Sequence, residues 1–409
     1  MPEKRILSKN CGVIDPGDVE SYQARGGFKG LEKARGMSPE EVIAQVKASG
    51  LRGRGGAGFS CGAKWELARK SPGDEKFLIC NADEGEVGTF KDRYLLENDP
   101  FSLIEGMAIA GYAIGAKKGY IYLRAEYRYL LEGLLKAMAQ CKDEGYLKAL
   151  EIELREGAGA YICGEESALM NSMEGKRGES RFRPPFPPES GLFEKPTIIN
   201  NVETLVNVPH IIQNGSDWYH GMGTAESKGT KLFCVSGDVE RPGVYEMELG
   251  CDLEELVKDL AGAEEVGWVQ VGGSTGSVIP GDRLNTPLAY ETVLGSGAVM
   301  VFNMGRDVID FVYRTMEFLN EESCGKCTPC REGTEVMVEV LSRLVKGEGV
   351  EEDIRVLEEL SETMRLTALC GLGQTAPVPV LDTLKYFGKD YENRISQSVL
   401  LRSLKPVKG

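Results

Sequence analysis

The stretch LEIELREGAGAYICGEESALM, residues 150–170, passes through three kinds of local sequence. Its first residues, LEIELRE, are typical of a strand. The glycines that follow predict a turn, and a helix is expected to open near Glu165 or Glu166. A strand that leads through a glycine turn into a helix indicates an α/β layered domain.

The same alternation is repeated on the N-terminal side of this stretch. KFLICN (76–81) and GYIYLRAE (119–126) are expected strands. The apolar segment 101–116 and the segment 129–141 are expected helices, the first of them buried. Strands that alternate with helices favour a substantially parallel sheet.

A glycine run precedes the first expected strand. LRGRGGAGFSCGAKWE (51–66) has the G-x-G-x-x-G spacing at Gly53, Gly55 and Gly58, which in dinucleotide-binding folds follows a strand. Here it follows SPEEVIAQVKASG (38–50), a helix with a serine N-cap and a closing glycine. The ordinary Rossmann interpretation therefore fails, and the loop is either a tight packing turn or a nest of N–H groups for an anion.

Polar residues gather in three later segments. CNADEGE places carboxylates after an expected strand, where ligands bind in open α/β sheets. GAGAYICGEE is a second glycine turn at a strand end, with two glutamates at a helix start. INNVET supplies amides suited to a ring or a ribityl chain. Each carboxylate alone is more typical of a solvated loop or a helix cap. Together with the cysteine cluster described next, they favour a bound flavin. The residues concerned are Asp83, Glu84, Glu86, Glu165, Glu166, Asn200 and Asn201.

The strongest signal is ESCGKCTPCREG, with Cys324, Cys327 and Cys330 at C-x2-C-x2-C spacing. Three thiolates so spaced can hold three corners of a [4Fe–4S] cluster, whereas structural zinc more often uses two separated C-x2-C pairs. Zinc and free thiols remain alternatives. Cys370 is the favoured fourth ligand because it lies in the same helical region and precedes a glycine. Spacing alone also leaves four other cysteines open: Cys141, Cys163, Cys234 and Cys251.

Composition excludes several classes of function. The 409 residues carry a net charge of −15, so nucleic acid and anionic membranes are not expected partners. The N-terminus lacks a signal-peptide pattern and the longest apolar stretch is too short to span a bilayer, which favours a cytoplasmic protein without membrane insertion. Eleven cysteines without an export signal favour thiols or metal ligands over disulfides. We expect most non-cluster cysteines to be buried, and Cys11 and Cys61 to be exposed.

The sequence divides into four segments. Residues 1–37 are expected to be an irregular arm, and 38–227 the α/β domain. Residues 228–306 hold a predicted hairpin, a helix and two more strands, the pattern of a small ubiquitin-like β-grasp domain. Residues 307–409 follow a helical period.

Taken together, these segments resemble one known family. LRGRGGAGF, NADEGEVGTFKDR, GAGAYICGEESAL, PTIINNVET and SCGKCTPCREG stand in the order found in the NADH-oxidising, FMN- and iron–sulfur-containing 51 kDa-type subunit of respiratory complex I. Its relatives serve soluble NAD-dependent [FeFe]-hydrogenases and formate dehydrogenases, whose beta subunit this chain most resembles. The resemblance spans residues 25–395. It implies a Rossmann-like but non-standard FMN domain, a β-grasp (SLBB) domain, and an all-α bundle that carries a [4Fe–4S] cluster.

The resemblance also implies the site residues. Those expected near FMN are Gly53, Arg54, Gly55, Gly56, Lys64, Asn81, Asp83, Glu84, Tyr161, Gly164, Glu165, Asn200, Asn201 and Thr204. Glu86 and Glu166 are expected beside the nicotinamide of NADH as the catalytic pair, and Phe59 and Phe186 on its adenine. The cluster ligands are expected to be Cys324, Cys327, Cys330 and Cys370.

Two positions depart from the family pattern. Leu67 replaces an aromatic residue and removes one stacking surface. Arg183 replaces a lysine, which keeps the charge but not its geometry. The affinity for NADH is expected to differ from that of the family, while binding itself is retained.

The resemblance implies an NADH dehydrogenase (diaphorase) subunit that exchanges hydride between NADH and FMN. Single electrons would then pass through the cluster to a small [2Fe–2S] thioredoxin-like subunit and a larger iron–sulfur catalytic subunit. The tail CGLGQTAPVPVLDTLKYF is closer to soluble hydrogenase subunits, and a membrane-associated NADH:quinone oxidoreductase is the alternative. An interaction scaffold with a vestigial nucleotide site and a zinc protein are the rivals. With a short N-terminus and no cysteine after Cys370, the chain alone is not expected to bifurcate electrons.

Overall fold

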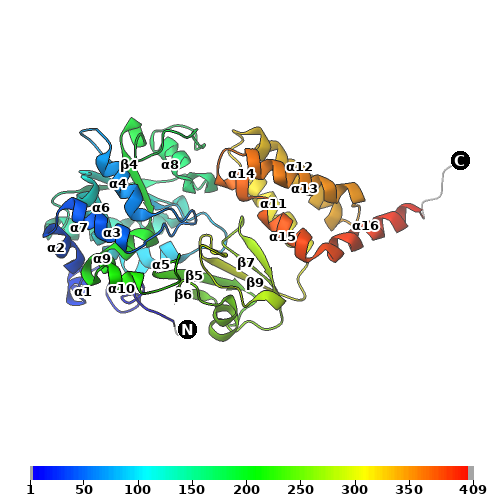
Figure 1. Ribbon diagram of the computed structural model, residues 1–409, viewed down its shortest axis with the longest axis horizontal. Coiled ribbons are helices and arrows are strands. Elements are labelled where there is room, and N and C mark those ends of the chain that lie inside the picture. The colour runs from blue at the N-terminus through cyan, green and yellow to red at the C-terminus, as the bar shows by residue number, and fades with distance from the viewer. Residues whose placement is uncertain (1–2, 404–409) are drawn as a thin grey trace.

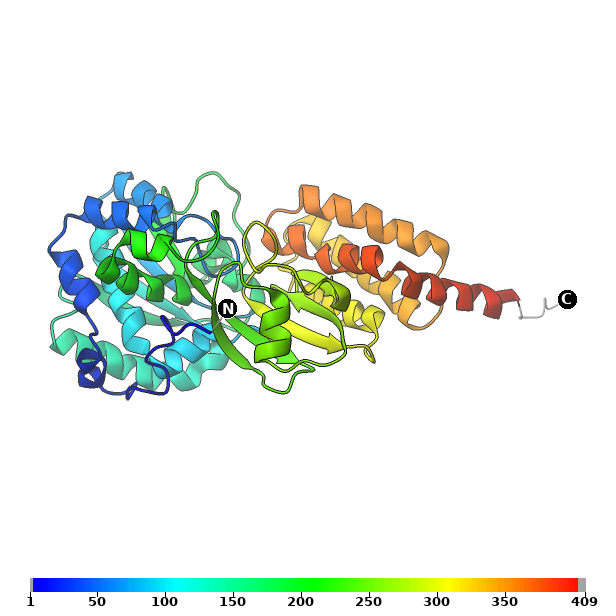
Figure 2. The same ribbon diagram turned by 60° about the horizontal axis from the view of Figure 1, so that its bottom comes forward.

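The structure, a computed structural model, describes residues 3–403, with side chains through residue 395. Three units follow one another along the long axis of the molecule (Figure 1, Figure 2). An α/β unit lies at the left of Figure 1, a second sheet lies below the centre, and helices drawn in orange and red lie at the right. The mixed α/β composition and the helical C-terminus were both predicted.

The first unit is built on a fully parallel sheet. Its strand order is β3-β2-β1-β4, and each neighbouring pair is parallel, as the alternating sequence pattern predicted. The strands are β1 (Phe77–Ala82), β2 (Lys118–Leu123), β3 (Glu151–Glu156) and β4 (Thr197–Asn201). The helices are α1 (Val19–Ala24), α2 (Lys29–Arg35), α3 (Pro39–Ala48), α4 (Cys61–Lys70), α5 (Lys91–Asn98), α6 (Pro100–Ile114), α7 (Leu131–Asp143), α8 (Glu166–Met173), α9 (Val202–Asn214) and α10 (Ser216–His220).

The N-terminal arm is more regular than predicted. Residues 1–37 were expected to be irregular, but they contain α1 and α2. The buried carboxylate of Glu105, on α6, accepts hydrogen bonds from Tyr22 Oη at 2.6 Å and from the backbone N–H groups of Phe28 and Leu31 at 2.9 Å. A buried carboxylate is stable only when such donors satisfy it. The sequence pattern missed this order because the anchoring residue lies far along the chain.

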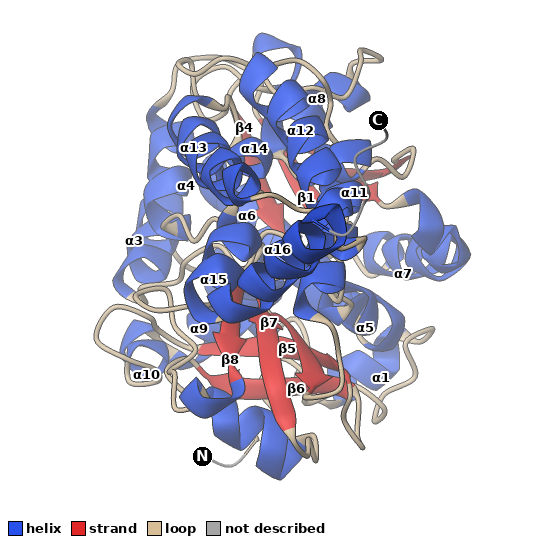
Figure 3. Ribbon diagram, turned by 90° about the vertical axis from the view of Figure 1, so that its right-hand side faces the viewer, coloured by secondary structure: helices blue, strands red, loops and turns tan. Residues whose placement is uncertain are grey.

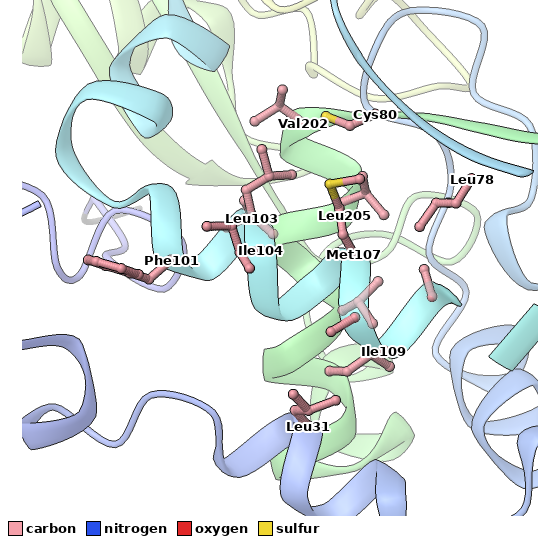
Figure 4. Packing of buried hydrophobic residues seen from close by; sticks show 14 of the residues in the cluster. Leu31, Leu78, Cys80, Phe101, Leu103, Ile104, Met107, Ile109, Val202 and Leu205 are labelled. Carbon is pink, nitrogen blue, oxygen red and sulfur yellow. The ribbon is translucent and has the colours of Figure 1, made fainter. Parts of the chain in front are cut away.

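The centre of the first unit is the contact between α6 and α9. In Figure 4, Leu103 and Met107 of α6 lie beside Val202 and Leu205 of α9. Almost every residue of α6 is buried, as expected of a helix without a polar face. The helices approach so closely at Gly106 that a Cβ atom there would lie 2.2 Å from the carbonyl oxygen of Leu205.

We expect Gly106→Ala to destabilise the protein by about 2–3 kcal/mol, because the added methyl would force two packed helices apart. Gly133→Ala, in α7, is the control, since nothing lies within 4 Å of the methyl group that it would add. That substitution should stabilise the helix by about 0.5 kcal/mol. Urea unfolding followed by circular dichroism measures both, and equal effects would contradict the close contact.

The second unit is a mixed five-stranded sheet with the order β6-β5-β9-β7-β8. The predicted β5–β6 hairpin is present, β5 and β9 are parallel, and β8 was not predicted. A π-helical turn (Glu255–Leu260) takes the place of the predicted α-helix. The strands are β5 (Thr230–Gly237), β6 (Gly243–Glu248), β7 (Val266–Val271), β8 (Ser277–Pro280) and β9 (Ala298–Asn303).

The third unit is helical, and Figure 3 views the molecule from its end. Its apolar core is centred on Val312, Met316, Leu341 and Leu357. Across the described residues, no helix combines the length and hydropathy needed to cross a membrane. The helices are α11 (Val308–Glu321), α12 (Thr328–Val345), α13 (Glu351–Thr367), α14 (Gly371–Thr375), α15 (Val378–Tyr386) and α16 (Gly388–Ser403).

Candidate functional site

A cavity of about 540 Å³ lies at the carboxyl ends of β1 and β4, where all three units meet. This is the edge of an open parallel sheet at which ligands usually bind, and the volume is within the range of cofactor sites. Ten of the predicted site residues line it: Gly55, Gly56, Asn81, Asp83, Glu84, Glu86, Tyr161, Gly164, Glu165 and Asn201.

Sequence reasoning missed the parts of the cavity wall that come from later in the chain. The β7–β8 loop with the two strand residues that flank it contributes 271–272 and 275–277, and the segment 292–296 precedes β9. The helix α14 and its surroundings supply Gly371, Leu372, Thr375 and Val378. The two loops of the second unit meet glycine to glycine, because a Cβ at Gly295 would lie 2.4 Å from the Cα of Gly272. The glycine pairs of VGGSTGS and LGSG were the available sequence signal.

Nine predicted residues lie outside the cavity wall: Gly53, Arg54, Phe59, Lys64, Glu166, Arg183, Phe186, Asn200 and Thr204. The Arg54 guanidinium is fully buried and donates to Tyr219 Oη at 2.8 Å and to the carbonyl oxygen of Lys228. The Asn200 side chain accepts from Trp65 Nε1 at 2.8 Å. These two side chains shape the loops around the cavity rather than its surface.

A second polar group lies at the start of α8. Lys64 Nζ donates to Glu166 Oε2 at 2.9 Å and to the carbonyl oxygen of Ile199 at 2.9 Å, and Arg183 pairs with Glu166 at 3.1 Å. Burial opposes the charge of Glu166, but Lys64 and Arg183 outweigh it and lower its pKa. Phe59 and Phe186 are 57% and 51% exposed, so both rings are accessible to a planar ligand.

The acidic loop after β1 is rigidly held. Glu86 accepts from Tyr161 Oη and from the Ser274 N–H of the second unit, both at 2.7 Å, and burial raises its pKa. Glu84 accepts from the N–H groups of Asp92 and Arg93 at the start of α5, at 2.8 and 3.0 Å. Carboxylates are favoured at helix N-termini. These bonds fix where the carboxylates lie relative to the cavity.

Asp83 is the carboxylate with capacity left for a ligand. It lines the cavity, and within the described residues its buried Oδ2 has no hydrogen-bond partner. Burial raises its pKa to about 7, although Arg124 partly offsets the effect. A buried acceptor without a partner calls for a donor from a bound group. The hydroxyl groups and ring N–H of FMN fit this requirement.

The raised pKa of Asp83 gives a pH dependence. The folded pKa of about 7 lies above the ordinary value of 3.8, so the folded state holds the proton more tightly. Stability contributed by Asp83 is therefore present below pH 4 and lost as the pH rises towards 7. In FMN-free protein, the stability of the wild type relative to Asp83→Asn should fall by on the order of 2–4 kcal/mol over that interval. Urea titrations at each pH measure it, with exposed Asp217→Asn as the control; a constant difference would contradict the shift.

Four cysteines line a second, small cavity: Cys324, Cys327, Cys330 and Cys370. Among the described residues, no three His, Cys, Asp or Glu side chains converge tightly enough to hold one metal ion. The four cysteines instead line one shared cavity, as expected of ligands that each hold a different corner of a cube. Burial and the neighbouring thiols raise the pKa of Cys330 to about 11, so a bound cationic centre would be needed to hold it as a thiolate.

The other seven cysteines take no part in this cavity as the structure describes it. All seven are buried, so the prediction that Cys11 and Cys61 are exposed was wrong. Both pack into the core of the first unit, where a thiol acts as a small apolar side chain.

The two cavities share a wall. Ile162, from the turn before α8, and Leu372, from α14, each line both of them. Because the same two residues line both cavities, the wall between the cavities at this point is a single layer of side chains. A redox group in the first cavity would therefore lie next to a cluster in the second.

Comparisons with known proteins cover both cavities. Residues 46–210 match the Nuo51 FMN-binding domain, and residues 310–394 match the NADH-ubiquinone oxidoreductase-F iron–sulfur binding region. The chain is 46% identical to the NADP-reducing hydrogenase subunit HndC of Solidesulfovibrio fructosivorans, over 96% of this chain and 83% of that protein. It is 43% identical to the F 2 subunit of the NADH-quinone oxidoreductase of Rhizobium meliloti, over 96% and 98%.

A solved structure shows the same fold. The crystal structure of an NAD+-reducing [NiFe]-hydrogenase in the air-oxidized state matches with a TM-score of 0.88 at 38% identity. The match covers 100% of this chain and 72% of that chain. The likeness therefore extends over all three units.

Proposed function

Because this chain belongs to the family of 51 kDa-type NADH dehydrogenase subunits with an FMN-binding domain and a 4Fe–4S-binding region, we propose that it is the diaphorase subunit of a soluble NAD-dependent hydrogenase or formate dehydrogenase complex. The family makes it an NADH-dependent oxidoreductase subunit. The observation that carries the detailed proposal is the pair of adjoining cavities that share Ile162 and Leu372.

FMN would occupy the larger cavity, where, when bound, it converts a two-electron hydride into single electrons. The glycine loop, with Gly55 and Gly56 on the wall, leaves room for a phosphate or ring. Asp83 offers its unpartnered oxygen. Asn81 and Asn201 also line the cavity, and hydrogen bonds to the Gly164 carbonyl and to Asp92 hold their amides in place. These side chains bind and orient the flavin.

The residues proposed to bind NADH lie at the start of α8 and in the segments that contact it. Glu86 and Glu166 are the proposed neighbours of the nicotinamide, each held in place by the hydrogen bonds described above. Phe59 and Phe186 would stack on the adenine, with Arg183 as the neighbouring cation. Leu67, half exposed on α4, gives a smaller stacking surface than an aromatic residue would.

The cysteine cavity would hold the group that supplies single-electron transfer out of the subunit. Cys324, Cys327, Cys330 and Cys370 would hold the [4Fe–4S] cluster, and the aliphatic wall keeps water out of the gap between the two redox groups. The expected acceptors are a small [2Fe–2S] thioredoxin-like subunit and a larger iron–sulfur catalytic subunit. The working compartment would be the cytoplasm.

The proposed domain limits are those expected from the sequence. They are 38–227 for the FMN domain of Rossmann-like type, 228–306 for a β-grasp (SLBB) domain and 307–409 for the cluster-bearing bundle. They are preceded by an arm at 1–37, which contains α1 and α2 and packs into the core of the first unit. The parallel pairing of β5 with β9 between two antiparallel edges supports the β-grasp assignment.

A second candidate is the flavoprotein subunit of a membrane-associated NADH:quinone oxidoreductase. The match to the Rhizobium meliloti protein, which extends over 98% of its length, favours it. The higher identity to HndC supports the soluble hydrogenase assignment. Identification of the subunits that copurify with the chain separates the two.

The proposal is tested on protein purified without oxygen. We expect a flavin spectrum overlaid on a broad iron–sulfur band, about four irons per chain, bleaching on addition of NADH, and NADH-dependent reduction of artificial acceptors. Colourless protein that acquires neither group on anaerobic reconstitution would rule the proposal out. Colourless protein in which metal analysis finds zinc in place of iron would support the non-redox zinc protein instead.

A further inference from the structure

The glycine loop is held by side chains of the second unit. Lys231, on β5, donates from Nζ to the carbonyl oxygen of Arg54 at 2.9 Å. Tyr290, in the loop that precedes β9, donates from Oη to the carbonyl oxygen of Gly53 at 2.7 Å. Two successive peptide carbonyls of a loop in the first unit are therefore bonded to residues about 180 and 240 positions further along the chain.

These two bonds fix the direction of the N–H groups. In a trans peptide the N–H points opposite to the carbonyl. The carbonyl of Gly53 is bonded to Tyr290, and the N–H of the same peptide donates to Thr204 Oγ1 at 2.8 Å, so this peptide plane is fixed at both ends. The carbonyl of Arg54 accepts from Lys231, so the N–H of Gly55, which belongs to the same peptide, points away from Lys231.

The N–H of Gly55 is left for a ligand. Gly55 and Gly56 line the cavity, and within residues 3–395 no protein acceptor bonds the Gly55 N–H. Gly56 has a φ of +122°, a backbone conformation that favours glycine. A free backbone donor on a glycine turn is suited to an anion such as a phosphate.

The tyrosine is itself well anchored. The Arg52 guanidinium lies 4.0 Å from the centre of the Tyr290 ring, and Arg54 Nη1 donates to its hydroxyl at 3.1 Å. Lys231 is fully buried and pairs with Glu203 Oε2 at 3.1 Å. Neither side chain reaches the cavity wall, so both act on a ligand only through the loop.

We propose that Lys231 and Tyr290 are positioning residues that preset the Gly53–Gly55 peptides for the phosphate group of FMN. The second unit is then part of the flavin site without touching the flavin. This inference rests on the proposed function, because it assigns the cavity to FMN. It makes the interface between the first two units a determinant of flavin affinity, and specifically of the contribution of the phosphate.

The test uses the full-length chain, freed of flavin and titrated with FMN and with riboflavin, which lacks the phosphate. Tyr290→Phe removes one hydroxyl and keeps the ring, and it should weaken FMN binding about fivefold. Lys231→Met removes a charge-assisted bond and should weaken it about tenfold or more. Riboflavin affinity should be unchanged in both variants. Flavin fluorescence quenching measures each dissociation constant.

Tyr245→Phe is the matched control. Its hydroxyl also donates to a backbone carbonyl of the second unit, at 2.6 Å, but that carbonyl belongs to Arg241 in the turn between β5 and β6 and not to the glycine loop. FMN affinity should stay at the wild-type value. If Lys231→Met fails to fold, Tyr290→Phe still decides the outcome.

Two results would overturn the inference while leaving the proposed function intact. One is unchanged FMN affinity in Tyr290→Phe, and the other is equal weakening for FMN and riboflavin, which would indicate general disruption of the cavity. A wild-type chain that binds neither flavin would instead remove the proposed function, and this inference with it.

Discussion

A Cys370→Ser variant should lose the iron–sulfur cluster and keep its flavin. Cys370 is the N-cap residue of α14 and lines the cysteine cavity with the three residues of the C-x2-C-x2-C motif. A serine hydroxyl cannot replace the fourth thiolate under ordinary conditions because it stays protonated. Iron should fall from about four atoms per chain, and the electron paramagnetic resonance signal of the reduced cluster should vanish.

The functional consequence separates the two halves of the reaction. NADH should still bleach the flavin in Cys370→Ser, because this substitution leaves the side chains of the proposed FMN cavity unchanged. Electron delivery to an iron–sulfur partner should fall to background, because the exit through the cluster is gone. Stopped-flow absorbance follows the first step, and reduction of the copurified partner follows the second.

Cys163→Ser is the matched control for this experiment. Cys163 is a buried thiol beside Ile162, and sequence spacing alone left it as a possible fourth ligand. It does not line the cysteine cavity, so its substitution should leave iron content unchanged. A cluster lost in Cys163→Ser and retained in Cys370→Ser would refute the proposed ligand set.

The second large effect is expected in Glu203→Gln, which should destabilise the protein by about 3–5 kcal/mol. Glu203 is fully buried on α9 and pairs with both Lys91 and Lys231 at 3.1 Å. Burial opposes its charge, but Lys231 and Lys91 outweigh it and lower its pKa. A neutral amide would leave two buried ammonium groups with too little negative charge around them.

The loss of stability is measured from the urea midpoint of FMN-free protein, with unfolding followed by circular dichroism. Glu254→Gln is the control, because Glu254 pairs with Lys258 at 2.8 Å on the surface, where both side chains are about half exposed. That substitution should cost at most about 0.5 kcal/mol. Similar costs for the two variants would show that the buried network contributes no more than a surface pair.

Much of the first unit followed from local patterns. The strands β1, β2 and β3, the helix α3 before the glycine loop and the start of α8 near Glu165 were all predicted, because periodicity and helix caps act within a few residues. The strands β4 and β8 were missed. β4 is a short run that continues directly into α9, and β8 is held only by its pairing with β7.

The candidate site divides in the same way. The carboxylates after β1 and the three cysteines of the C-x2-C-x2-C motif stood out because their side chains and spacing carry the chemistry. The direction of the Arg54 side chain could not be predicted, because it depends on hydrogen bonds to Tyr219 and Tyr290, which lie far along the chain. The part that the second unit plays in the cavity wall was not predicted either, since its loops lack residues of distinctive chemistry.

The sequence by itself determined the family, the parallel sheet and the cysteine ligand motif, because each depends on residue type and short spacing. Only the tertiary structure decided that the β7–β8 loop and α14 complete the larger cavity, that Ile162 and Leu372 separate it from the cysteines, and that Lys231 and Tyr290 hold the glycine loop. Some of those contacts join residues more than 200 positions apart in the chain. They form only when the folded units pack against one another, so no local sequence pattern predicts them.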